Sequence, residues 1–276
     1  MLPAWHPHPD VWLVLGTVVA AYLIADRRHE RRTGQPTPAR QRKLFLGGMA
    51  LLFVASEWPM HDLSENHLYA AHMVQHMLFT LVAAPLLVAG TPAWMLRDVL
   101  RPRWAFRAFR LVTRPLVAIV LFNGVLLFTH WPDVVTASVT GPGIVHFAVH
   151  VVVVGSAYVM WWPVVSPLPE LPPINPPAQL LYLFIQSLAP TIPASFLTFG
   201  HEPLYDVYAT FTRMWGIDVM TDQLVAGLIM KLGGGVLLWS VMAVVFFRWA
   251  NREQREGWDA LRFQGVEREI RAEMGR

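Results

Sequence analysis

The sequence predicts an all-α integral membrane protein, a seven-transmembrane-helix bundle with its N-terminus outside and its C-terminus in the cytoplasm. Three observations predict this fold class. First, the 276 residues are 54% hydrophobic and 15% charged, whereas soluble domains carry about 25% charged residues. Second, the chain contains seven long apolar segments, and third, its Lys and Arg residues fall almost entirely between alternate segments. Cysteine is absent, which excludes a disulfide scaffold and any thiolate metal site.

Each of the seven apolar segments is long enough to cross a hydrocarbon core about 30 Å thick. The first has no basic residues before its apolar run, so we expect a retained helix and not a signal peptide. Pro190 and Pro193 predict a kink in the sixth. Residues 1–250 are predicted to form one transmembrane domain, and 251–276, where charges alternate, a charged cytoplasmic tail. The helices are expected near 9–25, 44–63, 66–90, 115–131, 143–163, 178–200 and 222–249.

The positions of Lys and Arg predict the orientation of the bundle. Seven lie between the first and second segments, six between the third and fourth, and seven from Arg248 onward; only Arg213 and Lys231 lie elsewhere. Positive residues favour the cytoplasmic side, so the N-terminus is predicted outside. Because topology accounts for the basic balance, no nucleic-acid partner is expected. We expect a multi-pass protein of the bacterial cell inner (plasma) membrane, in contact with membrane lipids.

Two pairs of histidines lie in the outer halves of the third and fifth predicted helices. Within each pair the residues are four positions apart, so both rings lie on one helix face. Neutral imidazole is a good ligand for copper, zinc or iron. We therefore expect a metal site, with copper the favoured ion, formed from His72, His76, His146 and His150, with His67 and His130 as further candidate ligands. His61 and His201 are assigned to outer loops. For either of them, and for His130 taken alone, a packing or hydrogen-bonding role is favoured.

Several other residues are candidates for a supporting role. Met73 and Met77 follow the paired histidines and carry thioethers that favour Cu(I), although core packing is the favoured role for both. Gln75 could orient a histidine ring. Asp222 and Gln223 could do the same, or Asp222 could be the N-cap of the last helix. Lys231 is the one charge within a span, where it could snorkel, pair with Glu57 or Asp222, or bind lipid headgroups.

The main alternatives to a copper site are of three kinds. The histidines could form a hydrogen-bonded network without metal. One histidine from each pair, for instance His76 and His150, could hold haem b. A metal permease is a third interpretation, ranked last because the inner halves of the helices are apolar. A retinal-type Lys231 is disfavoured, because the third helix carries histidines where a carboxylate counter-ion is needed. No nucleophile–base pair, phosphate loop or carboxylate dyad is visible, so no enzyme is predicted.

Several segments together carry a resemblance to a known family. They are "HMVQHMLFTLVAAPLLVAGTP" (72–92), "HWP" (130–132), "HFAVH" (146–150), "WWPVVSPLP" (161–169) and "TDQLVAGLIM" (221–230). They resemble the multi-pass cytochrome c oxidase assembly factors called CtaG, which are tied to caa-type oxidases. The resemblance implies a seven-helix protein that matures a haem–copper oxidase, with copper delivery to the catalytic subunit, or to its assembly intermediates, as the usual proposal. The positions that match the family's polar motifs are His72, Gln75, His76, His130, His146, His150, Asp222, Gln223 and Met230.

Overall fold

The computed structural model describes the backbone of residues 3–274 and the side chains of residues 3–256, and this described part is helical with no strand. Five helical runs in it are long and apolar enough to cross a membrane: Pro9–Thr33, Tyr69–Gly90, Gly143–Val165, Pro176–Phe199 and Val219–Glu256. Two sharply bent helix pairs raise the number to seven if each pair counts as one span. The all-helical class is confirmed, and the number of spans is five to seven.

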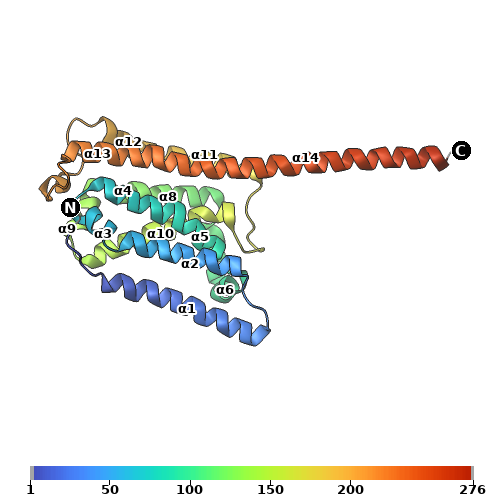
Figure 1. Ribbon diagram of the computed structural model, residues 1–276, viewed down its shortest axis with the longest axis horizontal. Coiled ribbons are helices and arrows are strands. Elements are labelled where there is room, and N and C mark those ends of the chain that lie inside the picture. Colours follow the sequence, from blue (N-terminus) through green and yellow to red (C-terminus); the bar gives the residue numbers. More distant parts are fainter. Residues whose placement is uncertain (1–2, 275–276) are drawn as a thin grey trace.

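The elements follow one another along the chain in a single order (Figure 1). They are α1 (Pro9–Thr33), α2 (Ala39–Ser56), α3 (Met60–Asn66), α4 (Tyr69–Met77), the π-helix η1 (Leu78–Ala83), α5 (Ala84–Gly90), α6 (Ala93–Val99), α7 (Arg103–Val112), α8 (Pro115–Thr129), α9 (Pro132–Thr140), α10 (Gly143–Val165), α11 (Pro176–Leu188), α12 (Thr191–Phe199), the 3-10 helix η2 (Asp206–Thr210), α13 (Val219–Leu228), the π-helix η3 (Ile229–Gly233) and α14 (Gly234–Met274).

Two of the predicted segments are shorter or more bent than expected. The helix expected over 44–63 ends at Ser56, and α3 follows at an angle of 46°. Pro59 causes this break, because its ring removes a backbone donor and disfavours helical geometry in the residue before it. The helix expected over 115–131 ends at Thr129, and Pro132 begins the unpredicted helix α9. The sequence pattern therefore did not reveal two short helices, α3 and α9, which lie at the same end of the bundle as the N-terminus.

Three of the spans are interrupted within their length. The π-helices η1 and η3 replace α-helical turns between α4 and α5 and between α13 and α14. The predicted kink in the sixth span is present at Pro190, between α11 and α12. Pro193 lies in the first turn of α12, where backbone amides have no intrahelical partner and proline is tolerated. All three interruptions fall at the same region of the core, described below.

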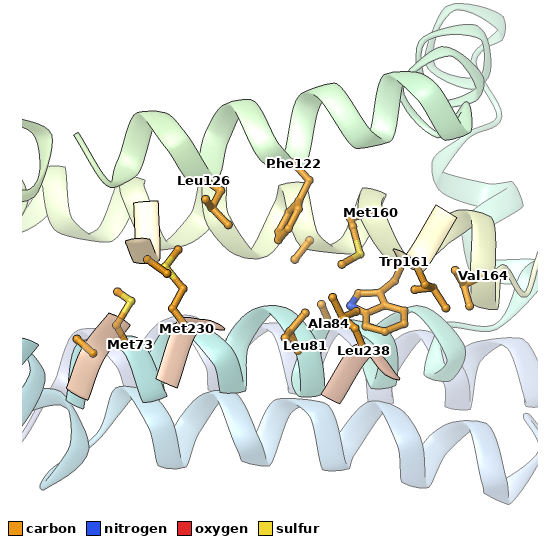
Figure 2. Close-up of a cluster of buried hydrophobic side chains, with 14 of the residues drawn as sticks. Met73, Leu81, Ala84, Phe122, Leu126, Met160, Trp161, Val164, Met230 and Leu238 are labelled. Atoms are coloured by element: carbon orange, nitrogen blue, oxygen red, sulfur yellow. The ribbon is translucent and has the colours of Figure 1, made fainter. Parts of the chain in front are cut away.

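The main hydrophobic core lies between α8 and α10 on one side and α4, η1, α5, α13 and α14 on the other. Figure 2 shows Phe122, Leu126 and Met160 facing Leu81 and Met230 across this core. Dispersion contacts among these apolar side chains contribute to the packing between the helices, which also bury polar side chains such as Gln75, Gln186 and Gln223.

A smaller core joins α1, α2 and α5. The Tyr22 ring stacks on Phe45 with centroids 3.9 Å apart, and its hydroxyl donates to the Gly90 carbonyl. A Cβ at Gly90 would lie 2.3 Å from the Phe45 nitrogen, so only glycine permits this approach of α5 to α2. By contrast, α1 stands apart from α10 and packs mainly against α2 (Figure 1).

The two ends of the bundle differ in composition. The N-terminus, α3 and α9 lie at one end, and α6 with the arginine-rich connections lies at the other (Figure 1). Helix α14 continues beyond the bundle to Met274. The predicted charged tail, 251–276, thus begins within α14, and its side chains beyond Glu256 lie outside the described residues.

Candidate metal centre

Three ligand-bearing side chains meet where α3 touches the first turn of α10. His61 and Glu65 are one turn apart on α3, so they share a face, and His146 approaches from α10. Glu65 Oε1 lies 3.1 Å from His61 Nε2 and 2.6 Å from His146 Nε2. One ligand atom from each residue lies within 4.8 Å of the other two. We call these three residues the carboxylate–histidine cluster.

Neighbouring polar groups hold the two imidazoles of this cluster. Gln75 donates to the Ala55 carbonyl at 2.7 Å, accepts from the Ser64 hydroxyl, and lies 3.4 Å from His61 Nδ1. Ser138 lies 3.3 Å from His146 Nδ1. Each ring therefore has its Nδ1 beside a polar partner and its Nε2 beside Glu65, and these contacts fix the orientation of both rings. Gln75 thus contacts a histidine ring, as the sequence suggested, but the ring is that of His61 on α3, and the amide nitrogen of Gln75 faces it as a donor.

A continuous series of imidazole contacts leads from this cluster into the bundle. Ring centroids are 5.4 Å apart for His61 and His146, 4.2 Å for His146 and His150, and 5.6 Å for His150 and His76. The series ends at His72, 4.2 Å from His76, and at His130, 6.1 Å from His76. The structure therefore brings the two predicted histidine pairs together at one depth. We call this series the histidine chain.

Several ring nitrogens of the histidine chain are buried without a hydrogen bond to any described residue. They are His72 Nδ1, His76 Nε2, His130 Nε2 and His150 Nε2. Leaving a buried polar group without a partner costs about 1–3 kcal/mol. A metal ion or a water molecule would satisfy these atoms, and neutral imidazole nitrogens with free lone pairs suit copper, zinc or iron. The donor set thus fits the ion that the sequence predicted.

Two spaces adjoin the histidine chain. A small cavity of about 40 Å³ is lined by His76 and His130 together with Met77, Met160 and Met230. We call it the sulfur-lined cavity. A larger groove of about 570 Å³ opens between α1 and α10, with Glu65 and His146 on its wall. The carboxylate–histidine cluster is thus accessible from the side of the bundle that α1 covers incompletely.

The remaining predicted ligand, His67, lies apart from these residues. It follows α3 at the protein surface, and its Nδ1 is 2.9 Å from the Thr212 carbonyl. Met73 is fully buried in the main hydrophobic core (Figure 2). Neither residue lines the cavity or belongs to the carboxylate–histidine cluster.

The suggestion that Asp222 is the N-cap of its own helix is wrong. Helix α13 begins at Val219, and Asp218 is its N-cap, accepting from the amides of Met220 and Thr221. Hydrogen bonds from Thr221 hold the pKa of the exposed Asp218 carboxyl below its usual value. The sequence prediction placed the helix start three residues too late.

Asp222 instead holds the first turn of a different helix. Its carboxylate accepts from the backbone amides of Tyr69 and Ala70 at 2.9 Å, and from the Arg213 guanidinium at 2.9 Å. The first amides of a helix have no intrahelical partner, and the buried carboxylate accepts hydrogen bonds from two of them. Its negative charge also interacts favourably with the positive end of the helix dipole. Asp222 thereby fixes the position of α4, which carries His72 and His76.

Gln223 and Tyr205 hold the loop that covers His130. The Gln223 side chain accepts from the Leu204 amide at 2.8 Å and donates to the Tyr205 carbonyl. The Tyr205 hydroxyl donates to the His130 carbonyl at 2.8 Å. Burial raises the pKa of Tyr205 to about 12, so it remains a donor at neutral pH. Gln223 therefore acts on the site through this loop and touches no histidine of the chain.

Lys231 has a partner that the sequence did not indicate. Its ammonium lies 5.5 Å from the centroid of the Phe199 ring, a cation–π contact. The suggested pairing with Glu57 or Asp222 is not present among the described residues, where Trp12 donates to Glu57 and Arg213 binds Asp222. Lys231 is only partly buried and contributes nothing to the histidine chain.

Sequence reasoning missed two members of the carboxylate–histidine cluster. His61 was assigned to a loop, and Glu65 was not considered. The available signal was the spacing of four residues between them, which places both on one face if the segment is helical. Pro59 obscured that signal, because the short helix α3 begins directly after it.

Comparison with known protein families settles what the chain is. The model of the family described as cytochrome c oxidase caa3 assembly factor (Caa3_CtaG) matches residues 20–252, most of the chain. The chain belongs to this family. No curated protein and no solved structure gives a match. As a Caa3_CtaG member with several apolar spans, the protein is a multi-pass membrane protein that acts in cytochrome c oxidase assembly, with the oxidase or its assembly intermediates as partner. The resemblance seen in the sequence is confirmed.

Proposed function

We propose that this assembly factor is not an enzyme and that it holds copper at the carboxylate–histidine cluster for transfer to the catalytic subunit of a haem–copper oxidase. The observation that carries the proposal is the convergence of His61, Glu65 and His146, with ligand atoms within 4.8 Å of one another. Two imidazoles and a carboxylate form a typical set for a first-row transition metal. Family membership supplies the recipient, an oxidase under assembly.

The proposed topology places this cluster at the outer face of the bacterial plasma membrane. The arginine-rich connections lie at the opposite end of the bundle, which the positive-inside rule assigns to the cytoplasm. An outer location suits delivery into an oxidase from the periplasmic or extracellular side. The groove between α1 and α10 gives a membrane-embedded partner lateral access to Glu65 and His146.

The haem alternative has less support from the geometry. The His76 and His150 rings are already in edge contact, with centroids 5.6 Å apart and planes at 73°. The cavity beside His76 has a volume of about 40 Å³, while cofactor pockets are typically about 300–1,000 Å³. A bis-histidine haem would therefore require these helices to separate.

The permease alternative is also disfavoured. A transport path would need to continue from the cavity toward the arginine-rich end of the bundle. Figure 2 shows the core there filled by Ala84, Trp161 and Val164. An ion in a path without polar groups would lose its hydration without compensation.

Copper in the oxidase is the quantity that tests the proposal. Strains carrying His61→Ala, Glu65→Gln or His146→Ala should yield purified oxidase with a lower ratio of copper to haem and lower activity. His67→Ala is the matched control, since this histidine lies at the same end of the bundle but outside the cluster. Immunoblotting must show equal amounts of each variant in the membrane. A normal copper-to-haem ratio in all three cluster variants would refute the proposal.

Elemental analysis and an absorption spectrum of the purified protein separate the alternatives. Copper in the wild type that is lost in Glu65→Gln, without a Soret band, supports the copper interpretation. A Soret band that disappears in His76→Ala or His150→Ala would instead establish the haem interpretation.

A further inference from the structure

The sulfur-lined cavity differs in chemistry from the carboxylate–histidine cluster. Its wall carries two imidazoles and three thioethers, and none of its lining residues is charged. It lies deeper in the bundle, joined to the cluster through His150 and His76. These features call for a separate explanation of the cavity.

We propose that the sulfur-lined cavity is a second metal site, selective for Cu(I), with His76, His130, Met77 and Met230 as its candidate ligands. The inference rests on the proposed function, because it takes the carboxylate–histidine cluster as the source of the ion. It adds a distinct site, a specified oxidation state and a direction of transfer.

The two imidazoles present suitable lone pairs. His130 Nδ1 lies 2.7 Å from the Leu126 carbonyl, so Nδ1 carries the proton and Nε2 carries the lone pair. His130 Nε2 and His76 Nε2 are both buried and have no hydrogen-bond partner among the described residues. A buried acceptor without a donor is costly, and a bound cation removes that cost at both atoms.

The absence of charge in the lining selects the oxidation state. The cost of moving an ion into a low-dielectric interior scales with the square of its charge, so a divalent ion costs roughly four times as much as a monovalent one. The lining offers no carboxylate to offset that cost. Thioether sulfur is a soft ligand that favours Cu(I) over harder divalent ions. Both effects act in the same direction.

The size of the cavity excludes a hydrated ion. A volume of about 40 Å³ accommodates about three water molecules at 10–15 Å³ of this measure each. An ion with a complete hydration shell does not fit, so only an ion that exchanges water for protein ligands enters. Cu(I) does this readily with imidazole and thioether donors.

The helix interruptions converge on this cavity. Thr80 and Leu81 from η1, Met230 from η3 and Pro190 from the α11–α12 break all line it. π-Helical segments occur frequently at functional sites, because the extra residue per turn shifts side chains off the regular helix face. Two of them, which lie close together in the wall of one cavity, are consistent with a site shaped for a ligand.

The histidine chain provides a route between the two sites. Adjacent ring centroids are 4.2 Å apart for His146 and His150 and 5.6 Å for His150 and His76. Cu(I) can pass along such a series by exchanging one imidazole for the next. The ion keeps its oxidation state throughout, so no electron donor or acceptor is required.

Sulfur coordination of bound Cu(I) tests the inference. Full-length protein is purified in detergent, loaded anaerobically with Cu(I) against a chromophoric chelator, and examined by copper K-edge X-ray absorption. The wild type should show sulfur scatterers beside nitrogen. Replacing Met77, Met160 and Met230 together with leucine, a substitution that conserves volume, should remove the sulfur signal and weaken Cu(I) binding about tenfold or more. Met73→Leu is the matched control, a buried methionine of α4 outside the cavity, and should retain both.

A wild type without sulfur scatterers, or a triple variant that keeps them, would overturn the inference. Thermal unfolding of each variant must show that the fold is retained. The Glu65→Gln strain separates the two proposals. If the oxidase of the Glu65→Gln strain loses copper and the wild-type assembly factor shows no sulfur signal, the proposed function is supported and the second site is refuted. If the oxidase of that strain has normal copper and the wild-type assembly factor shows the sulfur signal, the second site is supported and the proposed function is refuted.

Discussion

Substitution of Asp222 distinguishes a structural carboxylate from a metal ligand. The carboxylate is fully buried, and Arg213, its ionic partner, is mostly buried. It accepts from Arg213 and from the first two amides of α4. We therefore expect Asp222→Ala to destabilise the protein and to leave the carboxylate–histidine cluster chemically intact.

The expected magnitude follows from these three contacts. Removing one partner of a buried ion pair costs about 3–5 kcal/mol. The two amide contacts resemble a helix cap, which contributes about 0.5–2 kcal/mol. This contribution is not added to the cost of breaking the ion pair, because the same carboxylate oxygens bind the amides and Arg213. At about 2–4 °C per kcal/mol for a domain of this size, the melting temperature should fall by about 6–20 °C. Asp222→Asn should lie between Asp222→Ala and the wild type, because its carbonyl oxygen still accepts from one amide.

Thermal unfolding in detergent, followed by circular dichroism, measures the shift, and copper is quantified in the same samples below the transition. Asp218→Asn serves as the control, since this exposed carboxylate caps only its own helix. A smaller shift is expected there than for Asp222→Ala. If Asp222→Ala abolished copper binding while leaving the melting temperature unchanged, the structural role of Asp222 would be refuted and a ligand role supported.

Three further outcomes are expected. Gly90→Ala should lower the free energy of unfolding by about 1–3 kcal/mol, because its Cβ would meet the α2 backbone; Gly47→Ala, with open space around its Cβ, should not, and equal melting temperatures would contradict this account. Gln75→Ala should weaken copper binding about tenfold by releasing the His61 ring, and an unchanged dissociation constant would show that the ring is held by other groups. His67→Ala should leave the copper stoichiometry of the purified protein unchanged, and a lost copper ion would bring this surface residue into the site.

The local sequence predicted the long helices well but most of their interruptions poorly. Apolar length predicted the five helical runs that are long enough to cross a membrane, and the four-residue spacing of His146 and His150 predicted their shared face. Proline predicted the kink at Pro190 but concealed α3 after Pro59. The π-helices η1 and η3 leave no signature in hydrophobic periodicity, because both lie inside continuous apolar runs.

The sequence by itself determined the helical class, the membrane character, the family and the histidine pairs, because composition, span length and spacing along one helix are local properties. Only the tertiary structure decided that Glu65 joins His61 and His146, that Asp222 caps a helix 153 residues away along the chain, and that thioethers and imidazoles share one cavity. Those contacts join distant parts of the chain. They depend on helix breaks and on glycine-permitted approach between helices, and no periodicity within a single segment records either.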